Sequence, residues 1–176
     1  MDQQAVFDLV QQLKNVLPPT RENNRAMAAV SALDQLMAIQ SEPFVYSADF
    51  ATGSLPGPIP PAGVATFNIN IQKDANFKIL AGAYQCDVAG APQLTSTQQV
   101  PIAVVQLTDT GSGRAFFDRP VPIISVFGNG QLPFPWPMPK VMKALSTLQV
   151  QVTNNDTVNT INLRLNFIGN KEYALS

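Results

Sequence analysis

The chain has no histidine, a single cysteine and few charged residues, and each shortage excludes a class of site. Histidine is the commonest general base and a common transition-metal ligand, so both roles lose their usual side chain. The one thiol, Cys86, cannot form an internal disulfide or a multi-thiolate metal site. Its position in a predicted strand favours a small core side chain over a reactive one. We therefore expect no cofactor, no metal site and no catalytic residues.

Charged residues make up 13% of the 176 residues, about half of the roughly 25% that is typical of soluble domains. The net charge is -1 and no basic cluster is present, which argues against binding to nucleic acid or to an anionic membrane. No apolar run approaches the ~18 residues of a membrane span, and the first residues do not resemble a secretory signal. Because protein interfaces are depleted of Lys and Glu, this composition favours lasting contact with other proteins.

Two amphipathic helices are predicted within residues 4–40, separated by Pro18 and Pro19. Their apolar residues recur at steps of three and four, which places them on one stripe of each helix. Such a stripe packs either on the sheet of its own chain or, as an arm, on a neighbouring subunit. The partner-binding candidates in this segment are Phe7, Val10, Leu13, Leu17, Met27, Val30 and Met37.

The next part of the chain is expected to connect this arm to a body. Residues 44–50 alternate as a strand does, and residues 53–63 (GSLPGPIPPAG) contain four prolines, which favour a stiff, extended connector. The predicted organisation is a helical arm at 1–42, a strand and proline-rich connector at 43–63, and a β-sandwich at 64–176.

From Val64 onward the sequence has the two-residue period of half-buried strands. Alternating runs are predicted at 64–72, from Phe77 through Ile79, Ala81 and Ala83, at 147–153 and at 161–167. Two continuous apolar runs, 102–107 and 123–127, are also predicted to be strands, the first of them covered on both sides. Seven or eight short strands with no helix between them indicate a mainly β protein. We expect an antiparallel, jelly-roll-like β-sandwich with an N-terminal two-helix arm.

The segment Asp109-Thr110-Gly111-Ser112 resembles the catalytic turn of aspartic proteases. Those enzymes need a second carboxylate, which small dimeric members obtain from the partner subunit. The same residues are also common in ordinary turns between strands. We favour the turn because the polar Thr108 directly precedes Asp109, and a dimeric aspartic protease remains the remote alternative.

Proline occupies alternate positions in LPFPWPMPK, residues 132–140. Such a segment is extended and cannot join a central ladder. Its large side chains either seal one end of the sandwich or form an exposed anchor for a partner. Phe134, Trp136 and Met138 are therefore the remaining partner-binding candidates.

Residues 64–173 resemble virion structural proteins of tailed bacteriophages, of the β-sandwich class that decorates, cements or caps capsids. The resemblance rests on FNINIQKDANFKI, on LTDTGSGRAFFDRPVPI, on a glycine before the proline-rich crossing, on STLQVQVTNND and on a closing strand that ends in Gly-Asn-Lys. It implies a non-enzymatic virion protein that assembles in the host cytoplasm. Such a protein associates with itself, as a trimer, and binds the major capsid protein or another virion protein. A phage tail or baseplate component, or a receptor- or glycan-binding module, is the alternative.

Overall fold

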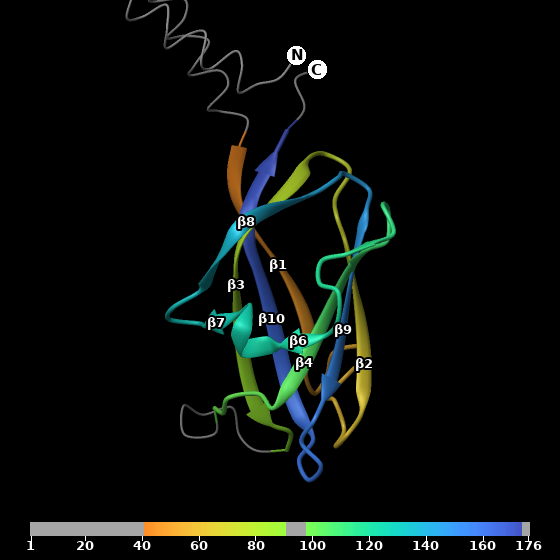
Figure 1. The fold of residues 1–176 in the computed structure, drawn as a ribbon, viewed down its shortest axis with the longest axis vertical. Coiled ribbons are helices and arrows are strands. Elements are labelled where there is room, and N and C mark those ends of the chain that lie inside the picture. The colour runs from red at the N-terminus through yellow and green to blue at the C-terminus, as the bar shows by residue number, and fades with distance from the viewer. Residues whose placement is uncertain (1–40, 91–97, 174–176) are drawn as a thin grey trace, which may run out of the picture. The chain divides into compact units, whose positions relative to one another are not determined.

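The computed structural model describes residues 41–90 and 98–173, which form a sandwich of two β-sheets (Figure 1). In the first sheet the order is β1-β10-β3, and β7 and β8 both pair with the outer edge of β3. In the second the order is β2-β9-β4, and β5 and β6 both pair with β4. The pairing is antiparallel except for the two-residue parallel contact of β3 with β7. The strands are β1 Ser41–Phe50, β2 Val64–Asn70, β3 Asn76–Val88, β4 Ala103–Asp109, β5 Arg114–Ala115, β6 Val121–Pro122, β7 Gly128–Asn129, β8 Phe134–Met142, β9 Thr147–Asn154 and β10 Ile161–Glu172.

The core lies between the two sheets and is built from the inward faces of the alternating strands. On β9 and β10 the predicted apolar positions are buried, and on β2 Ile69 is buried between exposed Asn68 and Asn70. The prediction of a mainly β sandwich is therefore confirmed for the described residues. The largest fully buried side chains are Phe50, Phe77, Phe127, Phe167, Ile59, Ile79, Leu107, Ile123, Met142, Leu148, Ile161 and Leu163.

A β-bulge in β3 interrupts the alternation that the sequence predicts for that strand. Phe77 and Ile79 face the core as predicted, but the pairing with β10 skips Leu80. One extra residue exchanges the two faces of a strand. Beyond Leu80 the core cluster contains Cys86, with Tyr84 packed against it, whereas Ala81 is half-buried and Ala83 is buried outside that cluster.

The apolar run 123–127 was predicted to be a strand, and this prediction is wrong. The run begins with the short 3-10 helix η2, Ile123–Ser125. The backbone N–H groups of Val126 and Phe127 both donate to the carbonyl oxygen of Ile123, at 3.1 and 2.9 Å. Ile123 and Phe127 are both fully buried. Their spacing of four residues fits a single helical turn with one buried side, which an apolar run also permits.

The other apolar run, predicted at 102–107, forms β4 but is fully covered on one face only. Ala103, Val105 and Leu107 are buried, whereas Val104 and Gln106 are half-buried. The second sheet therefore has one core face and one partly open face, as is usual for antiparallel sheets.

Residues 43–63 lie inside the compact unit that begins at Glu42, whereas the sequence places them outside the sandwich. β1 is a full member of the first sheet, and the connector is tied to β10 by two backbone hydrogen bonds between Ile59 and Ile161, at 2.9 and 3.0 Å. Phe50 and Ile59 are both fully buried. The predicted helices of residues 4–40 lie outside the described residues.

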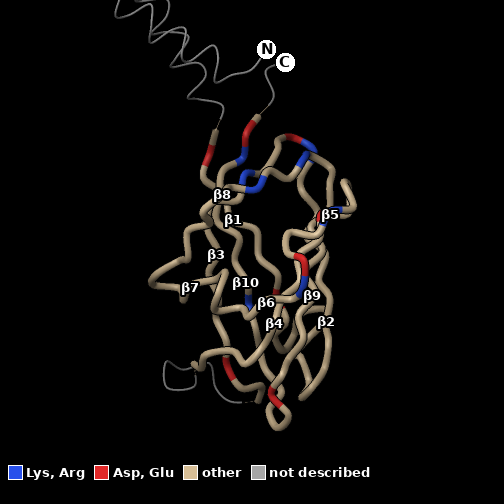
Figure 2. Tube along the Cα trace, viewed as in Figure 1, with Lys and Arg blue, Asp and Glu red and all other residues tan. Residues whose placement is uncertain are grey.

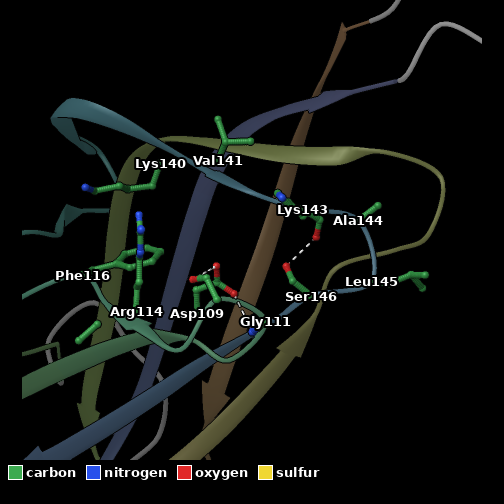
Figure 3. A pocket seen from close by; sticks show the side chains of 12 residues that line it. Asp109, Gly111, Arg114, Phe116, Lys140, Val141, Lys143, Ala144, Leu145 and Ser146 are labelled. Atoms are coloured by element: carbon green, nitrogen blue, oxygen red, sulfur yellow. Dashed lines mark hydrogen bonds between the residues drawn. The ribbon is translucent and has the colours of Figure 1, made fainter.

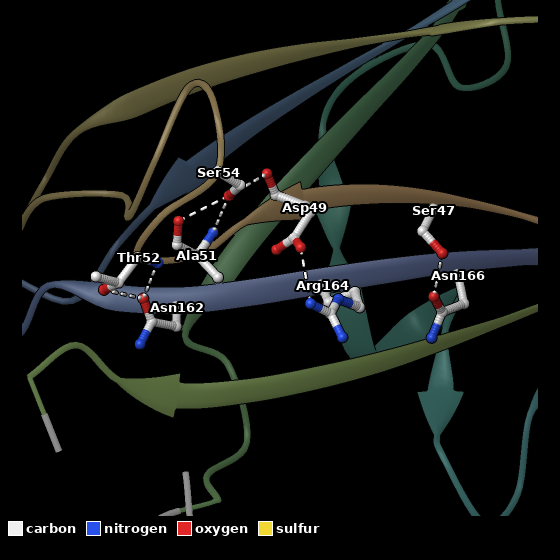
Figure 4. A network of polar contacts seen from close by, with 8 residues as sticks. All are labelled: Ser47, Asp49, Ala51, Thr52, Ser54, Asn162, Arg164 and Asn166. Carbon is white, nitrogen blue, oxygen red and sulfur yellow. Dashed lines mark hydrogen bonds and ion pairs between the residues drawn. The ribbon is translucent and has the colours of Figure 1, made fainter. Parts of the chain in front are cut away.

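Side-chain contacts between β1 and β10 lock this strand in place (Figure 4). The Ser47 hydroxyl donates to Asn166 Oδ1 at 2.7 Å, and Arg164 forms a 2.7 Å ion pair with Asp49. Residue numbers rise along β1 as they fall along β10, so the two strands are antiparallel. The start of β1 and the end of β10 lie side by side, and the Tyr173 hydroxyl donates to the Glu42 carboxylate (Figure 1).

Cys86 is a core side chain, as the sequence predicts. It is buried in β3, and this burial raises the pKa of its thiol to about 11. Because the thiolate is the reactive form, Cys86 is almost entirely in its unreactive form at neutral pH.

Candidate functional site

β8 is an edge strand that exposes large apolar side chains. The exposed fractions are 76% for Leu132, 36% for Phe134, 73% for Met138 and 52% for Val141. Three prolines of this strand lack a backbone N–H: Pro135, Pro137 and Pro139. Pro135 is the one that pairs with Ala81 in β3. The strand therefore offers few hydrogen-bond donors and is poorly suited to accept another β-strand. A partner of this edge would bind through side-chain contacts. We call the four exposed side chains the β8 ridge.

The middle of β8 bows away from β3, and Trp136 folds back onto the core at this point. Residues 136–139 lie opposite Leu80 alone. The indole N–H of Trp136 donates to the carbonyl oxygen of Val126 at 2.9 Å. Its ring meets those of Phe116, Phe127 and Phe167 edge to face, with ring centres 6.2–6.4 Å apart. Of the two alternatives for this segment, Trp136 fits the seal, whereas Phe134 and Met138 are exposed as an anchor would be.

Asp109 ends β4, and both of its carboxylate oxygens are engaged in the turn that follows. Oδ1 accepts a hydrogen bond from the Gly111 N–H at 2.9 Å, and Oδ2 accepts one from the Ser112 hydroxyl at 2.6 Å. This is the geometry of an Asx turn. Within the described part of the chain the carboxylate acts as a turn residue.

Replacing Asp109 with asparagine is expected to lower the free energy of unfolding by about 1 kcal/mol or less. The amide oxygen retains the bond to Gly111, and the loss is confined to a partly exposed charge-assisted bond from Ser112. Urea denaturation measures this change. Wild type and variant are incubated in parallel with a peptide library at pH 4–6. Cleavage by the wild type that the variant lacks would revive the protease alternative.

Lysine and arginine residues gather at one end of the sandwich (Figure 2). The turns that join β2 to β3, β4 to β5 and β8 to β9 form this end. Two of its lysines are paired, Lys78 with Glu172 at 3.5 Å and Lys171 with Asp74 at 3.0 Å. The hydrogen bond from Lys171 lowers the pKa of Asp74 below its ordinary value. The cations of this end that form no ion pair with the described residues are Lys73, Arg114, Lys140 and Lys143.

Three of these unpaired cations line a cavity of about 690 Å³, which we call the end pocket (Figure 3). Arg114 comes from β5, Lys140 from β8 and Lys143 from the turn after β8. Arg114 and Lys140 lie on one side of the pocket, and Lys143 lies on the other (Figure 3). Lys140 Nζ is 6.0 Å from the centre of the Phe116 ring. The end pocket thus joins the edges of both sheets.

The remaining lining of the end pocket is mixed. Asp109 contributes a carboxylate and Ser112 and Ser146 contribute hydroxyl groups, whereas Val141 and Leu145 contribute apolar surface. The Ser146 hydroxyl donates to the carbonyl oxygen of Lys143 at 2.6 Å, so its own oxygen still has acceptor capacity. The site can therefore offer positive charge, hydrogen-bond acceptors and apolar contact together.

Among residues 41–90 and 98–173, no three Asp, Glu or Cys side chains come together in a way that could hold a metal ion. No helix in the same part of the chain has the length and apolar character needed to cross a membrane. The predicted partner-binding residues Phe7, Val10, Leu13, Leu17, Met27, Val30 and Met37 lie outside the described residues, and their role stays a prediction.

No protein-family model and no curated protein matches the chain. Solved structures resemble it at a low level. Dimeric latent PorU from Porphyromonas gingivalis has 9% identity and a TM-score of 0.34, and the match covers 76% of this chain and 13% of that one. The infectious bursal disease virus Gx strain structure has 11% identity and a TM-score of 0.32, and the virus's VP2 subviral particle has 10% and 0.27. Each of these two matches covers 77% of this chain and 38% of the other. With TM-scores this low, we base no functional argument on these similarities.

Proposed function

We propose that the protein is a non-enzymatic virion structural protein that associates with itself, as a trimer, and binds a capsid lattice as a decoration, cement or vertex component. The strand order supports this proposal, because β1-β10-β3-β8 opposite β2-β9-β4-β5 is the arrangement of a jelly roll. Jelly rolls are common in viral capsid and lectin domains. Fold alone does not assign a function, so the argument depends on the surface.

The observation that carries the proposal is the β8 ridge. Three of its four apolar side chains stand on β8 and the fourth, Leu132, lies just before it; the prolines of this edge strand discourage strand addition, and only 13% of the chain's residues are charged. Burying a fully exposed large apolar side chain contributes about 1.5–3 kcal/mol, so these four partly exposed side chains contribute roughly 4–7 kcal/mol before the costs of association. That is enough to hold subunits together when contacts repeat around a symmetric assembly.

The double substitution Phe134→Ser and Met138→Ser is expected to weaken self-association at least tenfold. Met138 is 73% and Phe134 36% exposed, and neither belongs to the buried core, so the change removes apolar contact at the surface. Sedimentation equilibrium of the full chain measures it. The wild type is expected at about 57 kDa, three copies of the 19.0 kDa chain, and the variant at the mass of one copy.

Leu55→Ser with Val158→Ser is the control, because these apolar side chains are exposed, at 88% and 78%, but lie in other loops. It should retain the wild-type mass. If the β8 double variant keeps that mass too, then the ridge does not join the subunits. A wild-type chain that stays at 19.0 kDa up to high concentration would contradict self-association altogether.

A further inference from the structure

We infer that the end pocket binds a sugar acid, that is, a polyhydroxylated ring that carries one carboxylate. The inference goes beyond the proposed virion role and does not depend on it. The cations on one side of the pocket recognise the carboxylate, and the cation or cations on the other side, together with the rest of the lining, recognise the ring.

Charge is the first reason. Three of the chain's eleven Lys and Arg residues line one cavity, and none of the three is paired with a described carboxylate. The single acid of the pocket, Asp109, already accepts hydrogen bonds from Gly111 and Ser112. The excess of positive charge favours an anion. The presence of Asp109 disfavours an anion with several charges, such as a phosphate dianion.

Size is the second reason. A cavity of about 690 Å³ falls within the range of about 300–1,000 Å³ that is usual for small-molecule sites. Arg114 and Lys140 lie on the opposite side from Lys143 (Figure 3). An inorganic ion would occupy one side only, whereas a sugar ring with a carboxylate can contact both.

The uncharged lining is the third reason. The hydroxyl groups of Ser112 and Ser146 donate within the protein, and their oxygens can still accept hydrogen bonds from the hydroxyl groups of a sugar. The Phe116 ring and the Val141 side chain offer apolar surface to the C–H face of such a ring.

Leu145 gives a further, independent indication. Its φ is +64°, in the left-handed region where bulky residues are rare, and its side chain is 77% exposed at the pocket. An exposed leucine in this conformation adds little to the core. Asn or Gly at this position would form the same turn with less backbone strain. Backbone strain of this kind is often found at ligand sites.

The test is calorimetric titration of the full chain with glucuronate and with N-acetylneuraminate, the two probes, at low and high salt. We expect saturable binding of at least one probe. Lys143→Gln is expected to weaken it about tenfold, because a charge-assisted hydrogen bond is lost. Arg119→Gln is the matched control, since Arg119 is an exposed cation outside the pocket that pairs with Asp118, and binding should be unchanged.

Three further titrants decide the nature of the site. Methyl glucoside should bind at least tenfold more weakly than glucuronate, because it lacks the carboxylate. Glutarate and sulfate should also bind at least tenfold more weakly, because they lack the ring. Equal binding of sulfate or glutarate would show a simple anion site and overturn the inference. No saturable binding of either sugar acid, or equal weakening by Arg119→Gln and Lys143→Gln, would overturn it too.

The ridge variant Phe134→Ser with Met138→Ser should bind like the wild type, so this inference and the virion role can fail separately.

Discussion

A chain that begins at Val64 is expected not to fold, whereas a chain that begins at Ser41 is expected to fold. The first truncation removes β1 and the connector, and with them the fully buried side chains of Phe50 and Ile59. Losing buried Phe and Ile side chains costs about 2–5 kcal/mol each. It also leaves β10, a long core strand, as an unpaired edge. The combined loss of about 5–10 kcal/mol is comparable with the whole stability of a domain.

Circular dichroism melting and the dispersion of amide signals in NMR spectra measure the result. The chain that starts at Ser41 keeps every strand of the sandwich and serves as the control. Its mass in solution also shows whether residues 1–40 are needed for self-association. A well-dispersed spectrum from the Val64 chain would mean that β1 is only an accessory strand.

Replacing Gly169 with alanine is expected to lower the free energy of unfolding by about 3 kcal/mol or more. Gly169 lies at the irregularity where β10 passes the bulge in β3. A Cβ atom there would lie 2.0 Å from the carbonyl oxygen of Lys78 and 3.1 Å from the Cα of Ile79. Both are backbone atoms of the central strand, so relief requires the longest ladder in the sandwich to shift.

Gly130→Ala is the matched control, because a Cβ atom at Gly130 would meet nothing within 4 Å. It should change the free energy of unfolding by about 0.5 kcal/mol or less. Both variants can be compared with the wild type by urea denaturation, where midpoint and slope together give the free energy. Equal effects of the two substitutions would mean that the approach of β3 and β10 at the bulge is not tight.

The sequence is informative about strands that bury one face and alternate cleanly. On β10, Leu163 and Leu165 point into the core while Arg164 stays exposed, so the period of two shows directly in the residues. At the bulge in β3 the period of two cannot be recognised from the residues, because Ile79, Leu80 and Ala81 are all apolar and fit either register. The turn η2 was hidden for the same reason, since a short apolar run fits a strand and a helical turn equally well.

The two surfaces differ in how far the sequence could reveal them. The β8 ridge lies in one continuous segment, so Phe134 and Met138 could be chosen from the sequence alone. The end pocket could not be found in that way, because Arg114 and Lys140 are far apart in the chain and meet only through the stacking of the two sheets. The linear signal was limited to lysine and arginine residues scattered along the sequence.

The neighbouring positions of Glu42 and Tyr173 also determine how the body responds to force. β1 and β10 are adjacent and antiparallel, and Glu42 near the start of β1 lies beside Tyr173, which directly follows β10. Tension applied between these two points pulls the strands apart from their shared end, so the hydrogen bonds of the pair are loaded one after another. We therefore expect the β1–β10 pair to separate one hydrogen bond at a time, at low force. Tension applied between the end of β10 and the opposite end of the sandwich would instead act along the strands, and many interstrand hydrogen bonds would share the load at once.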